Sequence, residues 1–392
     1  MSEPAVSFRH VDIIFGERAA EGLKLLDQGA TRADILSKCG AILGVADASL
    51  DVGEGEITVL MGLSGSGKST LMRAVNGLNK PIRGSVMVRD GEKSVDVAKC
   101  DPETLRRIRM GKVAMVFQQF ALLPWRTVEE NAGFGLELAG VPEAERKARV
   151  QKQLDLVGLS AWGKKYAQEL SGGMQQRVGL ARAFATEAPI LLMDEPFSAL
   201  DPLIRTKLQD ELLALQRQLR RTIVFVSHDL DEALKIGTRI AIMESGRIVQ
   251  HGVPQDIVLK PANDYVAEFV AHMNPLNVLT GATMMSPTAK LRRNGEALLI
   301  DDIRDLRLGL SPAGGIQSAT LGGRPLSVTE GAEGRHPHGT LAAMAPSTSM
   351  RKIIDARRQT GLPVALVEDG RLIGIVGDEE IYNGILHRSA SS

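Results

Sequence analysis

The stretch MGLSGSGKST, residues 61–70, contains the residues whose types and spacing most directly predict chemistry. It lies between two apolar runs, so the pattern predicts a strand, a glycine-rich turn and the start of a helix. The spacing Gly62-x-x-x-x-Gly67-Lys68-Ser69 is the P-loop pattern, in which backbone N–H groups and a helix N-terminus surround a phosphate. Lys68 is placed to reach the outer phosphates of a nucleotide, and Ser69 to offer its hydroxyl to Mg²⁺.

We therefore predict that this loop binds the phosphates of a nucleotide. The alternative is a glycine-rich turn without a ligand, which gives no reason for a lysine and a serine directly after the last glycine. The predicted cofactor-binding residues of the loop are Gly62, Ser64, Gly65, Gly67, Lys68, Ser69 and Thr70.

An acidic pair follows a second apolar run, residues 189–193, which has the composition of a buried parallel strand. Adjacent carboxylates at the end of a central strand are costly to bury without a partner. Mg²⁺ is a suitable partner for Asp194, which leaves Glu195 to orient or deprotonate an attacking water. The alternative is an acidic turn with no catalytic role.

Two more polar side chains follow predicted strands, residues 113–117 and 222–226. The first is Gln118, although Gln119 competes for the same role, and the second is His228. In an open α/β sheet, the carboxyl ends of the strands face the ligand crevice. His228 is therefore a candidate contact for a γ-phosphate, with a structural histidine as the alternative.

Two further features complete the candidate site. LSGGMQQR, residues 170–177, places Ser171 and two glycines at a helix start, which predicts a second anion site without a lysine. Such a site makes sense if it completes another site. Phe15, at the end of a predicted first strand, is either a stacking platform for adenine or a core aromatic residue.

The elements that must position these residues indicate an α/β fold. We predict a nucleotide-binding domain over residues 1–278, with a helical insertion at 17–44 and a helical subdomain at about 119–188. The remainder, 279–392, begins with a Gly-, Pro-, Ser- and Thr-rich region that we expect to consist mostly of loops, with a weak strand at residues 298–300. It ends in a small α/β module at about 346–388.

Composition narrows the function. The 392 residues hold 47 basic and 47 acidic side chains and only 4% aromatics, which argues against binding nucleic acid. Cys39 and Cys100 fit no metal-binding spacing and are expected to be free thiols in a reducing compartment. No signal-like N-terminus and no long apolar run is seen, so we expect action at a membrane only from its cytoplasmic face, through a partner.

Together these motifs resemble the ATP-binding subunit of an ABC transporter, over roughly residues 5–270. The resemblance rests on GLSGSGKS, LSGGMQQR, ILLMDEP, SALD and SHD, in that order along the chain. It implies a P-loop NTPase of the ABC type with a helical subdomain. It also implies a head-to-tail homodimer with two ATP molecules at its interface, coupled to transmembrane permease subunits.

The resemblance also implies roles for single residues. Phe15 would stack on adenine, and Asp194 would position Mg²⁺ together with Ser69 and Gln118. Glu195 would be the general base, with Gln118 and His228 sensing the γ-phosphate. Ser171 and Gly173 would act on the ATP held by the opposing subunit.

Three segments resemble ATPases of glycine betaine, proline betaine and choline importers: GATRADILSKCGAILGV, VFQQFALLPWRTVEENAGFGLELAG and HMNPLNVL. This likeness implies an indirect partner, a periplasmic or surface substrate-binding protein. TGLPVALVEDGRLIGIVGDEEI resembles one CBS motif, which suggests a regulatory tail, whereas the segment before it departs from the CBS pattern.

Two other functions stay open. One is an importer ATPase for another small solute, such as a sugar or polyamine; those proteins usually carry a different β-rich tail and lack an insertion like 17–44. The other is a soluble ABC ATPase acting on nucleic acid or ribosomes. Such proteins tend to carry two nucleotide modules or long coiled-coil insertions, and the sequence shows neither.

Overall fold

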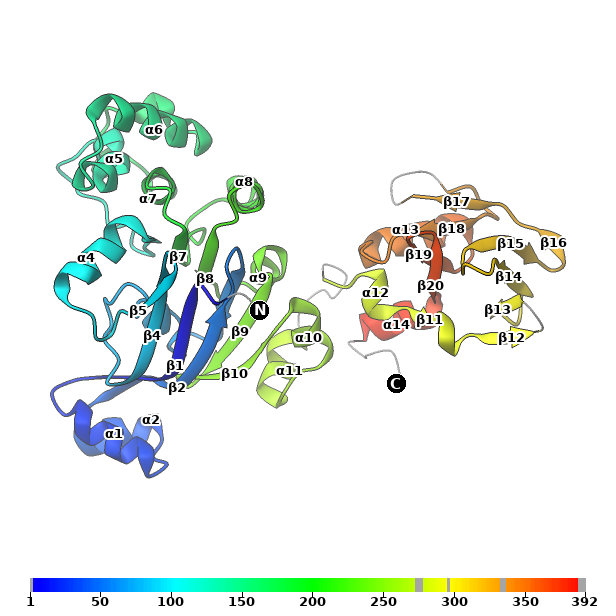
Figure 1. Cartoon of the computed structure of the whole chain (residues 1–392), viewed down its shortest axis with the longest axis horizontal. Coiled ribbons are helices and arrows are strands. Elements are labelled where there is room, and N and C mark those ends of the chain that lie inside the picture. The colour runs from blue at the N-terminus through cyan, green and yellow to red at the C-terminus, as the bar shows by residue number, and fades with distance from the viewer. Residues whose placement is uncertain (1–2, 272–277, 295–296, 332–335, 387–392) are drawn as a thin grey trace. The chain divides into compact units, whose positions relative to one another are not determined.

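The computed structural model describes residues 3–271, 278–294, 297–331 and 336–386 and divides into two compact units, Met1–Val253 and Pro254–Ser392 (Figure 1). The sequence prediction set the domain boundary after residue 278. The difference corresponds to two helices that cluster with the second unit, α10 (Pro254–Leu259) and α11 (Asp264–Ala271).

A six-stranded sheet forms the centre of the first unit, in the order β10-β9-β3-β8-β7-β6. The strands from β9 to β6 are parallel, and β10 pairs antiparallel with β9. β3, β7 and β8 are buried at every position, as expected where both faces of a parallel sheet are covered. The strands are β3 (Ile57–Met61), β6 (Val113–Val116), β7 (Ile190–Asp194), β8 (Thr222–Val226), β9 (Arg239–Glu244) and β10 (Arg247–Gly252).

A four-stranded antiparallel sheet in the order β2-β1-β4-β5 packs on one side of the parallel sheet. The core between the two sheets combines residues of both, such as Phe8 and Leu60, with Leu71 and Met72 from α3. The antiparallel strands are β1 (Val6–Phe15), β2 (Ile42–Val52), β4 (Arg83–Asp90) and β5 (Lys93–Asp96).

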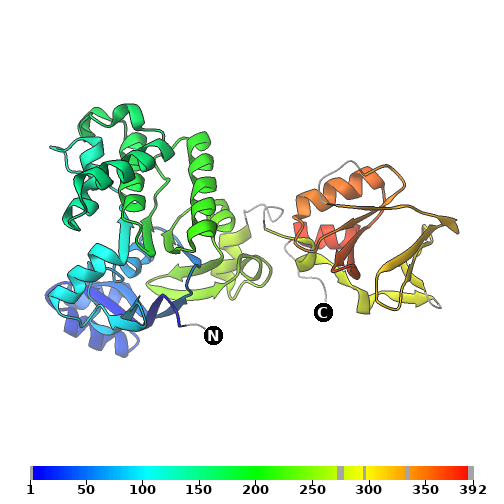
Figure 2. The same cartoon turned by 45° about the horizontal axis from the view of Figure 1, so that its top comes forward.

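The predicted helical subdomain consists mainly of three helices, α5 to α7, which lie together at one end of the first unit (Figure 1, Figure 2). The chain turns between the first two of these helices, because α5 ends at Leu138 and α6 begins at Glu143. The helices of the first unit after the insertion are α3 (Lys68–Met72), α4 (Pro102–Gly111), α5 (Val128–Leu138), α6 (Glu143–Leu156), α7 (Gly172–Ala185), α8 (Pro202–Leu219) and α9 (Leu230–Ile236).

Two short helices, α1 (Ala19–Asp27) and α2 (Arg32–Cys39), lie between β1 and β2, where the sequence predicts a helical insertion. A capping box begins α2: Thr31 Oγ1 accepts from the Asp34 N–H, and the Asp34 carboxylate accepts from the Thr31 N–H. The helix ends at Gly40, whose φ of 69° suits a glycine. The two helices have a small core of their own, shared with the ends of β1 and β2.

Arg83 fixes the insertion to the antiparallel sheet. Its Nε lies 2.5 Å from Oδ2 of Asp12, a carboxylate that is 1% exposed, and its Nη1 lies 2.7 Å from Oδ1 of Asp27 in α1. The other oxygen of Asp12 accepts from the Asp47 N–H at 2.7 Å. A buried carboxylate is stable only when it is paired in this way.

The second unit corrects one prediction, since residues 281–346 are rich in strands and are not mostly loops. The predicted weak strand at 298–300 is confirmed within β13. The other strands were not predicted because they are only two to six residues long, and some contain a glycine or proline, such as Gly309 in β14 and Pro325 in β16. An antiparallel sheet is formed by β12 (Arg292–Asn294), β13 (Ala297–Asp301), β14 (Leu306–Leu310), β15 (Ile316–Leu321) and β16 (Arg324–Pro325).

The small α/β module predicted at about 346–388 belongs to a second, mixed sheet of this unit, where β18, α13, β19, β20 and α14 follow one another along the chain. Alternate residues of β18 face opposite sides: Ala342 and Met344 pack with α13, whereas Leu341 and Ala343 pack with the antiparallel sheet. The elements are α12 (Gly281–Met284), β11 (Ser286–Pro287), β17 (Val328–Glu330), β18 (Leu341–Met344), α13 (Met350–Thr360), β19 (Val364–Glu368), β20 (Arg371–Val376) and α14 (Asp378–Ile385). Of HMNPLNVL, residues 272–277 lie outside the described residues.

We predict that Arg83→Met destabilises the first unit by about 2 kcal/mol, because the buried Asp12 loses its cation, and the 42% exposure of Arg83 moderates the loss. Urea unfolding followed by tryptophan fluorescence measures this, since both tryptophans, Trp125 and Trp162, belong to this unit. Arg18→Met, which breaks an exposed pair with Glu21, is the control and should leave the midpoint nearly unchanged. Equal midpoints for the two variants would contradict the assignment.

Candidate active site

Four neighbouring parallel strands, β3, β8, β7 and β6, bring the predicted site residues to one edge of the sheet. The P-loop follows β3, His228 follows β8, Asp194 ends β7, and Gln118 follows β6. A cavity of about 520 Å³ lies at this edge. It is lined by Phe15, Arg32, Ile42, Gly44, Ser64, Gly65, Gly67, Lys68, Ser69, Thr70, Gln118, Glu195 and His228.

Glycine is required at two positions of the P-loop. A Cβ on Gly62, whose φ is 141°, would lie 2.1 Å from the Met243 carbonyl oxygen. A Cβ on Gly67, whose φ is 102°, would lie 2.4 Å from the Gly44 carbonyl oxygen. The loop therefore packs closely against β9 and β2, and this packing holds its backbone in position for a phosphate.

Lys68 is buried, with 6% of its surface exposed. Its Nζ donates to the carbonyl oxygens of Gly62 at 2.9 Å and Leu63 at 3.0 Å. Burial lowers the pKa of Lys68 below the ordinary lysine value, while the negative charges of Glu195 and Asp194 oppose this shift. The arrangement presents a partly desolvated cation where the sequence predicts the outer phosphates of a nucleotide.

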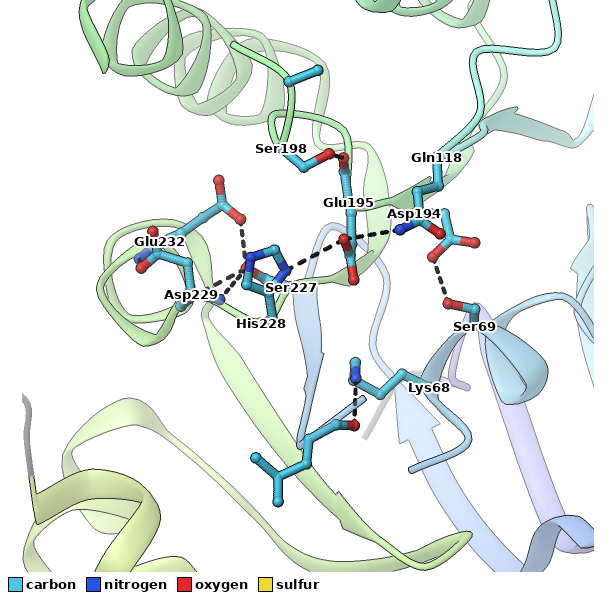
Figure 3. Close-up of polar contacts among 12 residues, drawn as sticks. Lys68, Ser69, Gln118, Asp194, Glu195, Ser198, Ser227, His228, Asp229 and Glu232 are labelled. Atoms are coloured by element: carbon cyan, nitrogen blue, oxygen red, sulfur yellow. Dashed lines mark hydrogen bonds and ion pairs between the residues drawn. The ribbon is translucent and has the colours of Figure 1, made fainter. Parts of the chain in front are cut away.

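Asp194 is fully buried beside the start of α3. The Ser69 hydroxyl donates to its Oδ1 at 2.6 Å (Figure 3). Arg73 Nη2 donates to its Oδ2 at 2.8 Å. Sequence reasoning missed Arg73, although it stands four residues after Ser69 and so shares that face of the helix. A hydroxyl and a carboxylate in contact are oxygen donors of the kind that Mg²⁺ accepts beside nucleotide phosphates, so these residues fit the predicted metal.

Glu195 lies between Gln118 and His228 (Figure 3). Its Oε2 accepts from Gln118 Nε2 at 3.1 Å and lies 3.3 Å from His228 Nδ1. Its backbone has a φ of 47°, which is unusual for a residue other than glycine. The Glu195 carbonyl oxygen accepts from Gln176 Nε2 at 3.1 Å and Ser198 Oγ at 3.0 Å, so the surroundings hold this conformation in place.

The loop that carries His228 is fixed by hydrogen bonds beneath it (Figure 3). The Ser227 hydroxyl donates to Glu232 Oε2 at 2.5 Å and accepts from the Asp229 N–H at 3.0 Å. Gln209 Nε2 donates to the other Glu232 oxygen at 3.1 Å. Burial raises the pKa of Glu232, and the hydrogen bonds from Ser227 and Gln209 oppose that effect.

Phe15 lines the cavity, and 39% of its surface is exposed. Its register partner on β2 is Ile42, which lines the same cavity and is 48% exposed. Sequence reasoning missed Ile42 and Arg32, because neither belongs to a phosphate-binding motif. The pairing of the two strands across the insertion is the signal that places Ile42 opposite Phe15.

Three predicted cofactor-binding residues do not line this cavity: Gly62, which begins the P-loop whose later residues do line it, and Ser171 and Gly173. Ser171 is exposed and caps α7, where its side chain accepts from the Met174 N–H. Gly173 follows in the first turn of that helix, close to the Ala199 carbonyl oxygen. Ser171 and Gly173 therefore lie outside the cavity that their own chain forms around Lys68 and Glu195.

We predict that ADP binding takes up a proton at alkaline pH. Free Lys68 has a lowered pKa and is neutral at a lower pH than an ordinary lysine, whereas a neighbouring phosphate favours its charged form. Calorimetric titrations in two buffers of different ionisation enthalpy measure the uptake. Lys68→Arg should show none, because a guanidinium stays charged. Absence of proton uptake by the unmodified chain would contradict the prediction.

Within the part of the chain that the structure describes, no helix combines the length and apolarity needed to cross a bilayer. Residues 45–198 match the family model described as ABC transporter. The fold resembles the solved dimeric structure of MJ0796, a bacterial ABC transporter cassette, with a TM-score of 0.55 and 29% identity over 64% of this chain and 98% of that one. MJ0796 bound to ADP and Pi, in a post-hydrolysis state, gives the same TM-score with 30% identity.

Curated relatives match over most of the chain. The glycine betaine/proline betaine transport ATP-binding protein ProV of Salmonella typhimurium is 46% identical over 79% of this chain and 83% of its own. The glycine betaine/carnitine transport protein GbuA of Listeria monocytogenes is 41% identical over 93% of both chains. The glycine betaine transport protein OpuAA of Bacillus subtilis is 40% identical over 96% of this chain and 94% of its own. The chain therefore belongs to the family of ATP-binding proteins of glycine betaine/proline betaine ABC transport systems, and it is an ATPase subunit coupled to transport.

Proposed function

We propose that this chain hydrolyses ATP to drive uptake of glycine betaine or proline betaine through a membrane permease. The observation that carries the catalytic part is the placement of Glu195 between Gln118 and His228, in one cavity with Lys68. The likeness to GbuA and OpuAA, which extends over nine-tenths or more of each chain, supports the substrate class. Choline is a related amine, and an uptake measurement distinguishes it from the two betaines.

The geometry supports a direct hydrolytic mechanism. The P-loop and Lys68 hold the phosphates, and Phe15 with Ile42 offers an apolar platform for the base. Glu195 takes a proton from water as the water oxygen bonds to the γ-phosphorus and the bond to the β–γ bridging oxygen breaks. Gln118 and His228 flank Glu195 and are placed to orient the water and the γ-phosphate.

Mg²⁺ fits beside the phosphates, where Ser69, Asp194 and Gln118 would hold it. The ion neutralises charge that develops on the phosphate oxygens. Arg73 shares the Asp194 carboxylate with Ser69, so two hydrogen bonds hold this ligand in one position.

A head-to-tail homodimer accounts for Ser171 and Gly173. Both lie outside the cavity of their own chain, yet they open α7 with N–H groups suited to an anion. In the proposed dimer, they would meet the ATP that is bound by the opposing subunit. The related cassette MJ0796 was solved as a dimer, which supports this arrangement.

The first unit has an apolar surface on which the permease would dock. An apolar groove of about 280 Å³ runs beside β6, α5 and α7. Its lining includes Leu78, Met110, Val113, Phe117, Phe134 and Leu138. Phe117 directly precedes Gln118, so a permease seated here would be linked to the γ-phosphate site through one segment. In this proposal, the chain would lie at the cytoplasmic face of the membrane, and a substrate-binding protein would deliver the amine from the other side.

Residues 279–392 would then form a regulatory region, with the CBS-like motif at about 346–388. Support comes from the strand-helix-strand-strand-helix order of β18 to α14 and from the separate core of these elements. The soluble ABC ATPase alternative gains no support, because the charge is balanced and the likeness to transport ATPases spans the chain.

We predict that proteoliposomes containing this chain, its permease and its binding protein take up glycine betaine or proline betaine when ATP is supplied. Glu195→Gln should lower uptake and ATP hydrolysis about 100-fold or more, with nucleotide binding retained, because the general base is lost. The measurements are uptake of each labelled amine and phosphate release.

Glu187→Gln is the matched control for this experiment. Glu187 also has a positive φ, 55°, and lies at the opposite end of β7, but its side chain is 55% exposed and outside the cavity. Its variant should transport normally. Uptake of choline alone would overturn the substrate assignment. Uptake of none of the amines with ATPase activity intact would leave only the ATPase assignment standing.

We predict that Leu138→Glu prevents assembly with the permease. This side chain is 53% exposed in the apolar groove, and a carboxylate there would be desolvated on docking. Co-purification with the permease in detergent measures assembly, and ATP binding by the free chain checks that the variant is folded. Leu219→Glu, at an equally apolar and 48% exposed site at the end of α8, is the control. Normal assembly of Leu138→Glu would contradict the proposed docking surface.

A further inference from the structure

Arg32 brings a second cation to the nucleotide cavity, and it belongs neither to the P-loop nor to the residues that follow the parallel strands. It is the first residue of α2, in the insertion between β1 and β2, and lies 33 positions before Gly65 in the sequence. Its Nη1 donates to the Gly65 carbonyl oxygen at 2.5 Å, at the crest of the P-loop. Its side chain lines the same cavity as Lys68 and Ser69.

The charges around the cavity favour an anionic ligand next to Arg32. Among the residues that line the cavity, Arg32 and Lys68 are the lysine and arginine side chains, and Glu195 is the acidic one. Lys68 is buried on two loop carbonyls. Arg32 is only partly buried, so its guanidinium can reach a ligand in the open part of the cavity.

The guanidinium of Arg32 is not neutralised by the protein. In the described part of the chain, its recorded hydrogen bond is the one to Gly65, and no carboxylate pairs with it. Asp34, the acidic residue nearest in the helix, is occupied by the capping box with Thr31 at 2.7 and 2.9 Å. An arginine carries five N–H donors in a planar fork that suits phosphate, so most of its donors stay available.

The position of Arg32 is well defined. The capping box fixes the first turn of α2, and Ile35 and Cys39 of the same helix are buried in the core of the insertion. The helix therefore cannot shift freely relative to β1 and β2. A fixed helix with a flexible arginine at its start can reach between the Gly65 carbonyl and a bound ligand without a change in fold.

We propose that Arg32 is a nucleotide-binding residue whose guanidinium contacts a phosphate oxygen of the bound nucleotide. The insertion then contributes directly to the nucleotide site and senses whether it is occupied. This inference rests on the proposed function, because it takes the cavity to be the ATP site. The shared contact with Gly65 lets Arg32 stabilise the loop crest when the site is empty and the ligand when it is filled.

The experiment compares ADP and adenosine binding to the full chain, each measured by displacement of a fluorescent ADP analogue. Arg32→Gln should weaken ADP binding about tenfold or more, because a charge-assisted hydrogen bond is lost, and should leave adenosine binding unchanged. Arg32→Lys should recover part of the ADP affinity, since the charge returns without the planar fork. Lys38→Gln removes an exposed cation from the last turn of the same helix and should change neither affinity.

Two results would overturn the proposal. Equal losses for ADP and adenosine in Arg32→Gln would mean that the substitution disturbs the whole cavity and removes no phosphate contact. Unchanged ADP affinity in this variant would mean that Arg32 does not contact the ligand. Failure of the unmodified chain to bind either ligand is a separate outcome, because it would count against the ATP site itself.

Discussion

The parallel pairing of β3, β8, β7 and β6 is the constraint on which the candidate site depends. Each strand is short and buried, so none can slip along its neighbour without exposing apolar side chains. The register of the strands therefore determines where, along the edge of the sheet, each following loop begins. Segments separated by more than a hundred residues, such as Ser69 and Asp194, come into contact at 2.6 Å because of it.

One residue with a left-handed backbone lies where the chemistry is expected. Glu195 has a left-handed backbone directly after a buried strand, and side chains from α7 and the following turn hold its carbonyl oxygen. The carboxylate is thereby turned away from Asp194, its neighbour in sequence, toward Gln118 and His228. The two adjacent acidic residues can then have different roles, because the backbone conformation directs their carboxylates to different partners.

Motifs made of special residue types were predictable from the sequence. The P-loop and the acidic pair each depend on local chemistry. The spacing identified Gly62 and Gly67, although it did not indicate their close packing against the Met243 and Gly44 carbonyl groups. Arg32, Ile42 and Arg73 were not found, because each reaches the site through tertiary contacts. The strands of residues 281–346 were missed for a related reason, since very short strands carry too few residues for a period of two to stand out.

The pairing of Phe15 with Ile42 has an evolutionary consequence. The chain leaves β1 and re-enters β2 at directly opposed positions, so a tight turn would close the same pair of strands without the two helices. The insertion is therefore topologically separable: gaining or losing it alters no strand order and no register elsewhere. The fold can therefore tolerate differences among cassettes in this insertion. Because Arg32 of the inserted helix lines the cavity, such differences can change ligand binding directly.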